Sequence, residues 1–148
     1  MSTVAVQAYD PIRLRRLTLW TGRVFSLCAT LIVLSSVTAK VTHNPGYVRE
    51  WGRLGFTEEI LTGVGLVQLA CLTVYLIPST SVFGAVLLTG YLGGAIASWV
   101  RLGEPYPMMV PLTTAILFWA GLYLREERLH SLVPLRRKPA DAGAPLPI

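Results

Sequence analysis

Four long apolar stretches divide the chain, at residues 17–39, 60–77, 81–100 and 108–124. An α-helix rises about 1.5 Å per residue, so roughly 20 apolar residues cross the hydrocarbon core of a bilayer. A spanning segment must also satisfy its own backbone hydrogen bonds, which favours helices. The pattern therefore predicts an all-α protein, a four-transmembrane-helix antiparallel bundle with up-down topology.

The first apolar stretch has a second interpretation, as a cleaved signal peptide. Arg13, Arg15 and Arg16 precede it, and residues 37–39 resemble a cleavage site. Its length favours a retained helix, and the three later spans need a packing partner.

The connections between the spans carry turn residues and aromatic rings. Residues 40–57 form the longest predicted loop. Aromatic rings favour the membrane–water interface. We therefore expect Tyr47, Trp51 and Phe56 in that loop, together with Trp99, to form an aromatic belt.

Several residues mark predicted helix ends. Thr57 followed by Glu58 and Glu59 predicts an N-cap with acids at the positive end of the helix dipole. Pro78 ends the second span. Pro111 is expected in the first turn of the fourth span, where a missing N–H costs least.

Basic residues are distributed unevenly between the two sides of the predicted membrane domain. Four spans place both termini on one side, which carries eight Lys and Arg residues, against four on the other (Lys40, Arg49, Arg53 and Arg101). The positive-inside rule then predicts a multi-pass protein with both termini cytoplasmic. Residues 1–16 form an N-terminal segment, residues 17–130 the membrane domain, and residues 131–148 a basic, Pro-rich tail.

Composition supports the lipid bilayer as the main partner. The chain is 53% hydrophobic and 14% charged, whereas soluble domains carry about 25% charged residues. Its net charge of +5 lies between the apolar runs and at the chain ends. This distribution is typical of membrane anchoring, so we predict no nucleic-acid partner.

No recognisable catalytic or metal-binding pattern is present in the sequence. Cys28 and Cys71 lie in apolar runs without a CxxC pair, which favours two buried thiols acting as small hydrophobes. No cluster of His, Cys and acids has metal-ligand spacing, and no GxSxG motif occurs. We predict no metal site, and no cofactor is evident.

Polar side chains within the spans are the candidates for function. Gln68 lies near the middle of the second span, and Thr89 and Tyr91 near the middle of the third. An interhelical hydrogen bond from Gln68 to one of these hydroxyls, or to Ser35, stabilises a bundle by about 1 kcal/mol. Two interpretations stay open: structural glue, or the polar floor of a ligand pocket.

Arg23 is the one basic residue inside the first span. It lies roughly 6 Å from the cytoplasmic boundary at the α-helical rise. Its guanidinium can extend to the lipid headgroups, or it can bind an anionic or quinone-like headgroup.

Small residues line one side of the third span. Gly90 and Gly94 form a GxxxG motif, and Gly93 and Ala97 form a second pair. Such faces let helix backbones approach closely. The motif predicts helix packing, either within the bundle or along the seam of a homodimer.

Two stretches carry a family resemblance: YLIPSTSVFGAVLLTGYLGGAIASWVRLGEP, residues 75–105, and LFWAGLYLREERLHSLVPLRR, residues 117–137. With the residues around them, from about Phe25 to Arg137, they resemble the DoxX-like family of small four-helix integral membrane proteins. The resemblance implies a four-helix bundle in a bacterial inner membrane.

The resemblance implies little chemistry, although the family name derives from a quinone-linked oxidoreductase subunit. Its pattern frequently has an acid at the position of Gln68 and a His at that of Trp99, and this sequence has neither. The first hypothesis is therefore a non-catalytic accessory protein or subunit of a membrane redox system, with a membrane-protein partner or a second copy.

The alternative is a membrane enzyme, such as a quinone-linked oxidoreductase component, or a binding protein for quinone or another lipophilic ligand. Its site would lie near Arg23, Gln68, Thr89 and Tyr91. A small transporter ranks last, because no repeat or broken midplane helix is evident.

Overall fold

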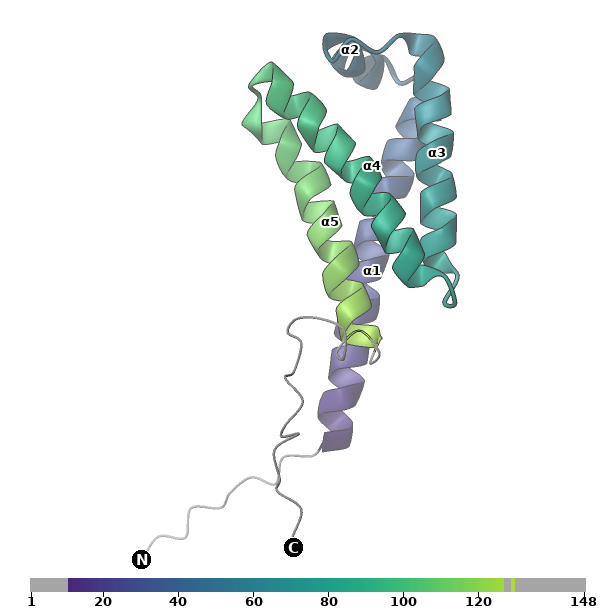
Figure 1. Cartoon of the computed structure of the whole chain (residues 1–148), viewed down its shortest axis with the longest axis vertical. Coiled ribbons are helices and arrows are strands. Elements are labelled where there is room, and N and C mark those ends of the chain that lie inside the picture. Colours follow the sequence, from purple (N-terminus) through teal and green to yellow (C-terminus); the bar gives the residue numbers. More distant parts are fainter. Residues whose placement is uncertain (1–10, 127–128, 130–148) are drawn as a thin grey trace, which may run out of the picture.

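The computed structural model describes residues 11–126 and Leu129, and all regular structure in this part is helical. The helices are α1 (Pro11–Val41), α2 (Pro45–Arg53), α3 (Glu58–Leu76), α4 (Ser81–Leu102) and α5 (Pro105–Arg125). Four of them, all except α2, are long and apolar enough to cross a membrane. The predicted all-α fold with four spanning helices is confirmed, and successive spans run in opposite directions (Figure 1).

The predicted loop at residues 40–57 contains a helix, which corrects the sequence interpretation. The first helix continues to Val41, and α2 starts only a few residues later. Asn44 caps α2 by accepting a hydrogen bond from the Gly46 N–H at 3.0 Å. Pro45 occupies the first helical position, where its fixed φ is suited to a helix.

Two other helix starts also differ from expectation. Thr57 is the N-cap residue of α3, but its side chain makes no capping hydrogen bond. The fifth helix begins at Pro105 rather than residue 108, so Pro111 lies inside the helix and not in its first turn. The early start follows from Pro105, which nucleates the first turn at no hydrogen-bond cost.

The four long helices form a ring in which each contacts two neighbours. The pairs are α1 with α3, α3 with α4, α4 with α5, and α5 with α1, while α2 rests on α1 and α3. Helices α3 and α4 meet at the turn around Pro78 and separate toward the end that carries α2 (Figure 1). We call these the turn end and the α2 end.

Close backbone contacts hold the turn end together at three glycines. A Cβ at Gly84 would collide with the backbone of Tyr75, and one at Gly121 would collide with Ser26. A Cβ at Gly22 would lie 2.9 Å from that of Leu124. Helix backbones approach this closely only where the residue has no side chain.

The interior and the outer surface of the bundle are both largely apolar. Ala29, Leu72, Leu88 and Phe118 form part of the buried core. Many large apolar side chains point outward from the spanning helices, among them Leu31, Leu66, Val86 and Ile116. Such a surface is stable in lipid rather than in water, which supports association with the bilayer.

The α2 end is tied to the rest of the bundle by polar contacts. Arg53 on α2 pairs with Glu104 in the connection between α4 and α5. Arg101 donates a hydrogen bond to the Leu54 carbonyl at 2.9 Å. His43, which has a positive φ of 50°, contacts Glu58 at 3.2 Å and Thr62 at 2.8 Å. These contacts fix α2 above the ends of the spanning helices.

Candidate functional site

Lys40 lies inside the bundle, not in an outer loop as the sequence suggested. It belongs to the last turn of α1, and only 1% of it is exposed. Its Nζ donates to Ser36 Oγ and to Gln68 Oε1, each at 2.7 Å. The correction leaves three of the four basic residues outside the bundle interior at the α2 end: Arg49 and Arg53 on α2, and Arg101 in the last turn of α4.

Aromatic rings surround the Lys40 ammonium. Its Nζ lies 4.8 Å from the ring centre of Trp51 and 5.7 Å from those of Tyr47 and Tyr91. Among the residues that the structure describes, no carboxylate pairs with Lys40. Neutral oxygens and ring faces therefore stabilise this buried cation, because a buried charge without partners is very costly.

Lys40 fixes the orientation of the Gln68 amide. An ammonium group can only donate hydrogen bonds, so the carbonyl oxygen of Gln68 must face it. This oxygen also accepts from Tyr91 at 3.0 Å and from Ser36 at 3.5 Å. The amide nitrogen therefore points the other way, where it has no partner among the described residues. Gln68 is only 2% exposed and lines a cavity of about 210 Å³.

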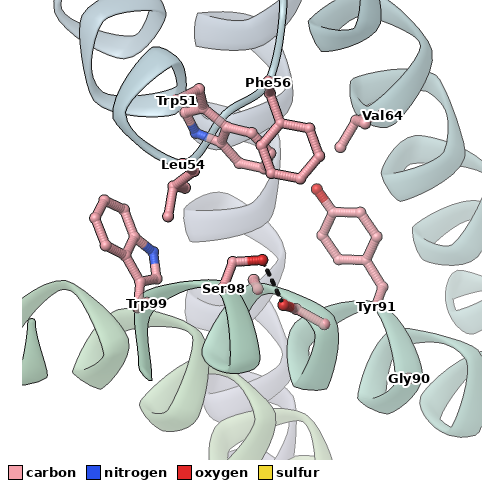
Figure 2. Close-up of a pocket in the computed structure, with 10 residues that line it drawn as sticks. Trp51, Leu54, Phe56, Val64, Gly90, Tyr91, Ser98 and Trp99 are labelled. Carbon is pink, nitrogen blue, oxygen red and sulfur yellow. Dashed lines mark hydrogen bonds between the residues drawn. The ribbon is translucent and has the colours of Figure 1, made fainter. Parts of the chain in front are cut away.

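Trp99 lines both this cavity and a larger neighbouring one, and its indole N–H faces the larger cavity. It is 7% exposed, and its indole N–H has no hydrogen-bond partner within the described part of the chain. Figure 2 shows the indole nitrogen turned toward the space between Leu54 and Ser98. Glu50 lines the smaller cavity together with Gln68, and its carboxylate forms no ion pair with a described residue. The two adjoining cavities together thus present two N–H donors and one carboxylate.

A larger apolar cavity lies beside the first, on the other side of Trp51, Ala95 and Trp99. Its volume is about 360 Å³, and its walls come from the α2 segment, α3 and α4 (Figure 2). The rings of Trp51 and Phe56 pack at 5.1 Å on one side. Opposite them, Ser98 satisfies its hydroxyl on the Gly94 carbonyl at 3.0 Å. This cavity therefore has mostly apolar walls, with the Trp99 N–H at one side.

The model of the DoxX-like family matches residues 24–121, which is more than half of the chain. The chain belongs to the DoxX-like family. Lys40, Gln68, Tyr91 and Trp99 all lie within the matched segment, whereas Arg23 precedes it. Searches of curated proteins and of solved structures find no match.

The structure of this DoxX-like chain confirms one predicted contact and changes two others. Gln68 meets Tyr91 as expected. The hydroxyl from the first span comes from Ser36, because Ser35 bonds to the carbonyl of Ile32 instead. Thr89 is not part of this cluster: it donates to Ala85 O at 2.7 Å and accepts from the Trp119 indole at 2.8 Å.

Arg23 lies far from Gln68 along the bundle, near the turn end of the DoxX-like chain. Its guanidinium carbon lies 5.6 Å from the ring centre of Trp20, and it lines a separate cavity. The structure therefore does not bring Arg23 together with the other three predicted residues.

The predicted packing glycines of α4 make no close contact within the described chain. A Cβ at Gly90, Gly93 or Gly94 would meet no atom within 4 Å. Gly90 and Gly94 instead line the larger cavity, and Ala97 lines a shallow pocket beside Arg101. Packing of this face against a second chain stays a prediction.

Three residues have surroundings that the sequence pattern did not indicate. Trp51 and Trp99 border the cavities, and their place in an aromatic belt stays a prediction. Cys28 is exposed on the outer surface of α1, so its prediction as a buried thiol is wrong, and Cys71 is half-buried. The described residues contain no group of three or more His, Cys, Asp or Glu side chains that could hold a metal ion. One of the two histidines of the chain, His130, lies outside the described residues.

Proposed function

We propose that this DoxX-like protein binds a lipophilic molecule at the α2 end through an acceptor oxygen of the ligand, and that quinones are the ligand class. One observation carries the proposal: Gln68 and Trp99 are largely buried side chains, and their N–H groups face two adjoining cavities without a partner among the described residues. No fully buried side-chain nitrogen or oxygen of the described residues lacks a partner, so these two N–H groups are open to the cavities. A carbonyl oxygen of a bound ligand would accept a hydrogen bond from either of them.

The shape and chemistry of the two cavities support a flat, carbonyl-bearing headgroup. Tyr47, Trp51 and Trp99 supply ring faces around the polar cavity, and aromatic faces stack well on flat conjugated rings. The larger apolar cavity adjoins it and suits a hydrocarbon substituent. The quinone assignment also agrees with what the family resemblance implies.

The proposed role is binding within a membrane redox system, as a non-catalytic accessory protein or subunit. No cluster of described side chains has the arrangement of a nucleophile, base and orienting acid at the cavity. A component that holds a quinone for a partner enzyme needs only the donors and the apolar walls.

Replacing Gln68 by leucine, or Trp99 by phenylalanine, is expected to weaken quinone binding about tenfold in each case. Each change removes one N–H donor and retains an apolar side chain, and one hydrogen bond is worth about 1 kcal/mol or slightly more. Equilibrium binding of a radiolabelled short-chain ubiquinone analogue to the purified protein in mild detergent measures the effect.

The matched control is Thr73→Val, which removes a hydroxyl from the same helix. Thr73 is exposed and bonds only to the Leu69 carbonyl, so its loss should leave affinity unchanged. Unchanged affinity in both site variants, or no binding by the parent protein above the lipid background, would contradict the proposal.

We further propose a bacterial inner-membrane location with both termini cytoplasmic. The charge asymmetry supports it, and it increases when Lys40 is removed from the outer group. In a variant whose native cysteines are replaced by alanine, Gly52→Cys on α2 should react with an impermeant thiol reagent added to spheroplasts. Ser79→Cys in the α3–α4 turn should react only after permeabilisation, and the reverse pattern would invert the topology.

A further inference from the structure

A second cavity with basic walls lies at the turn end, distant from the proposed quinone site. Its volume is about 270 Å³. Its polar side chains are Arg23 from α1, Arg125 from α5, Ser81 from α4 and Glu126. The two arginines flank the matched segment in the sequence, and they line one cavity because α1 and α5 are neighbours in the ring.

Neither guanidinium group has a carboxylate partner in the described part of the chain. Arg125 lies 5.1 Å from the ring centre of Tyr75, and Arg23 packs against Trp20 as described above. A guanidinium beside a ring is stabilised by the ring and can still donate N–H groups to an anion. Two such groups at one cavity match the oxygen atoms of a phosphate group.

The start of α4 adds positive potential to the same cavity. Ser81 is the first residue of this helix of 22 residues, and it is 4% exposed. The N-cap residue, Thr80, makes no capping bond, because its hydroxyl donates to the carbonyls of Val74 and Ile77. The first N–H groups of α4 thus have no side-chain acceptor, and the helix dipole favours an anion there.

We propose that this cavity binds the phosphate of an anionic phospholipid, with phosphatidylglycerol as the best match in charge. Two arginines and Glu126 give a formal charge of +1, which complements a phosphodiester that carries one negative charge and no amine. Leu19 and Leu76 also line the cavity, and Leu76 is 54% exposed on the lipid-facing surface. The apolar wall therefore continues outward along the path of the acyl chains, which favours a lipid over free phosphate.

Native mass spectrometry of the full-length protein, released from nanodiscs of mixed phosphatidylglycerol and phosphatidylethanolamine, tests the assignment. The parent should retain phosphatidylglycerol in preference to phosphatidylethanolamine. The double variant Arg23→Gln, Arg125→Gln should lose at least nine tenths of this adduct. The control Arg13→Gln, Arg16→Gln removes the same charge from the exposed start of α1 and should keep it.

Two results would overturn the proposal. Equal loss of phosphatidylglycerol in both double variants would mean that general surface charge attracts the lipid. Displacement of the lipid by an equal concentration of inorganic phosphate would mean that the acyl chains contribute nothing. If the glutamine variant does not fold, Arg23→Lys with Arg125→Lys keeps both charges and should bind several-fold more weakly, because an ammonium cannot form the paired bonds.

Discussion

Replacing Lys40 by methionine should leave the bundle at least as stable as the parent protein and weaken quinone binding about tenfold. Methionine has a similar length and no charge, so the change removes the cost of burying a cation that has no carboxylate partner among the described residues. Binding should fall because the Gln68 amide loses the ammonium that fixes its orientation. Thermal unfolding and equilibrium binding in the same detergent measure the two effects.

A double-mutant cycle shows whether Lys40 acts through Gln68. If it only positions the amide, Lys40→Met combined with Gln68→Leu should bind no more weakly than Gln68→Leu alone. Losses that add in full would mean that Lys40 contacts the ligand independently. A large drop in the thermal midpoint of Lys40→Met would instead identify the lysine as a structural element.

Alanine at Gly84 should destabilise the bundle by about 3 kcal/mol, near the upper end of the usual cost of overpacking. The new methyl group would collide with the backbone of Tyr75, and a backbone cannot move aside as a side chain can. The same change at Gly94 meets open space and should be neutral, or stabilising by up to about 1 kcal/mol through higher helix propensity.

Denaturant titration followed by circular dichroism compares the two glycine variants directly. Equal stability would contradict the packing of α3 on α4 at the turn end. If Gly94→Ala leaves the monomer stable but abolishes a dimer in analytical ultracentrifugation, the small-residue face of α4 is a seam between chains.

Hydropathy predicted the spanning helices well, because a segment in lipid needs little more than length and apolar side chains. The short helix α2 was missed for a physical reason. Its sequence begins with Pro45-Gly46 and is mostly polar, a pattern that also describes a turn. The start of α5 was placed too late for a similar reason. Pro105 and Pro107 suggested a linker, although proline is well tolerated in the first turn of a helix.

The site was predictable only in part. Gln68 and Tyr91 could be paired because polar groups in lipid must find partners. Lys40 was missed because a charge at the end of an apolar run suggests a loop. Its spacing of four residues from Ser36 was the available signal, since such residues share one helix face. Thr89 was misplaced because a threonine hydroxyl can satisfy itself on the carbonyl four residues before it.

The glycine motif shows a different limit of sequence reasoning. A GxxxG motif identifies a helix face that carries small side chains. It does not indicate which neighbouring helix, if any, this face contacts. In α4 that face borders a cavity, while the close contacts fall at isolated glycines such as Gly84 and Gly121. Only the packing of the whole ring determines which glycine meets a backbone.

The three tight glycine contacts hold the helices together at the turn end. The helices can therefore tilt about this end as about a hinge. Gly84 lies near the start of α4, and the cavities lie near its other end. A helix of about 20 residues is roughly 30 Å long, so a tilt of about 6° at this hinge moves its far end by about 3 Å. We therefore expect the α2 end to admit a headgroup from the lipid while the contacts at the turn end stay packed. Amide hydrogen exchange would then be fast at the α2 end and slow around Tyr75.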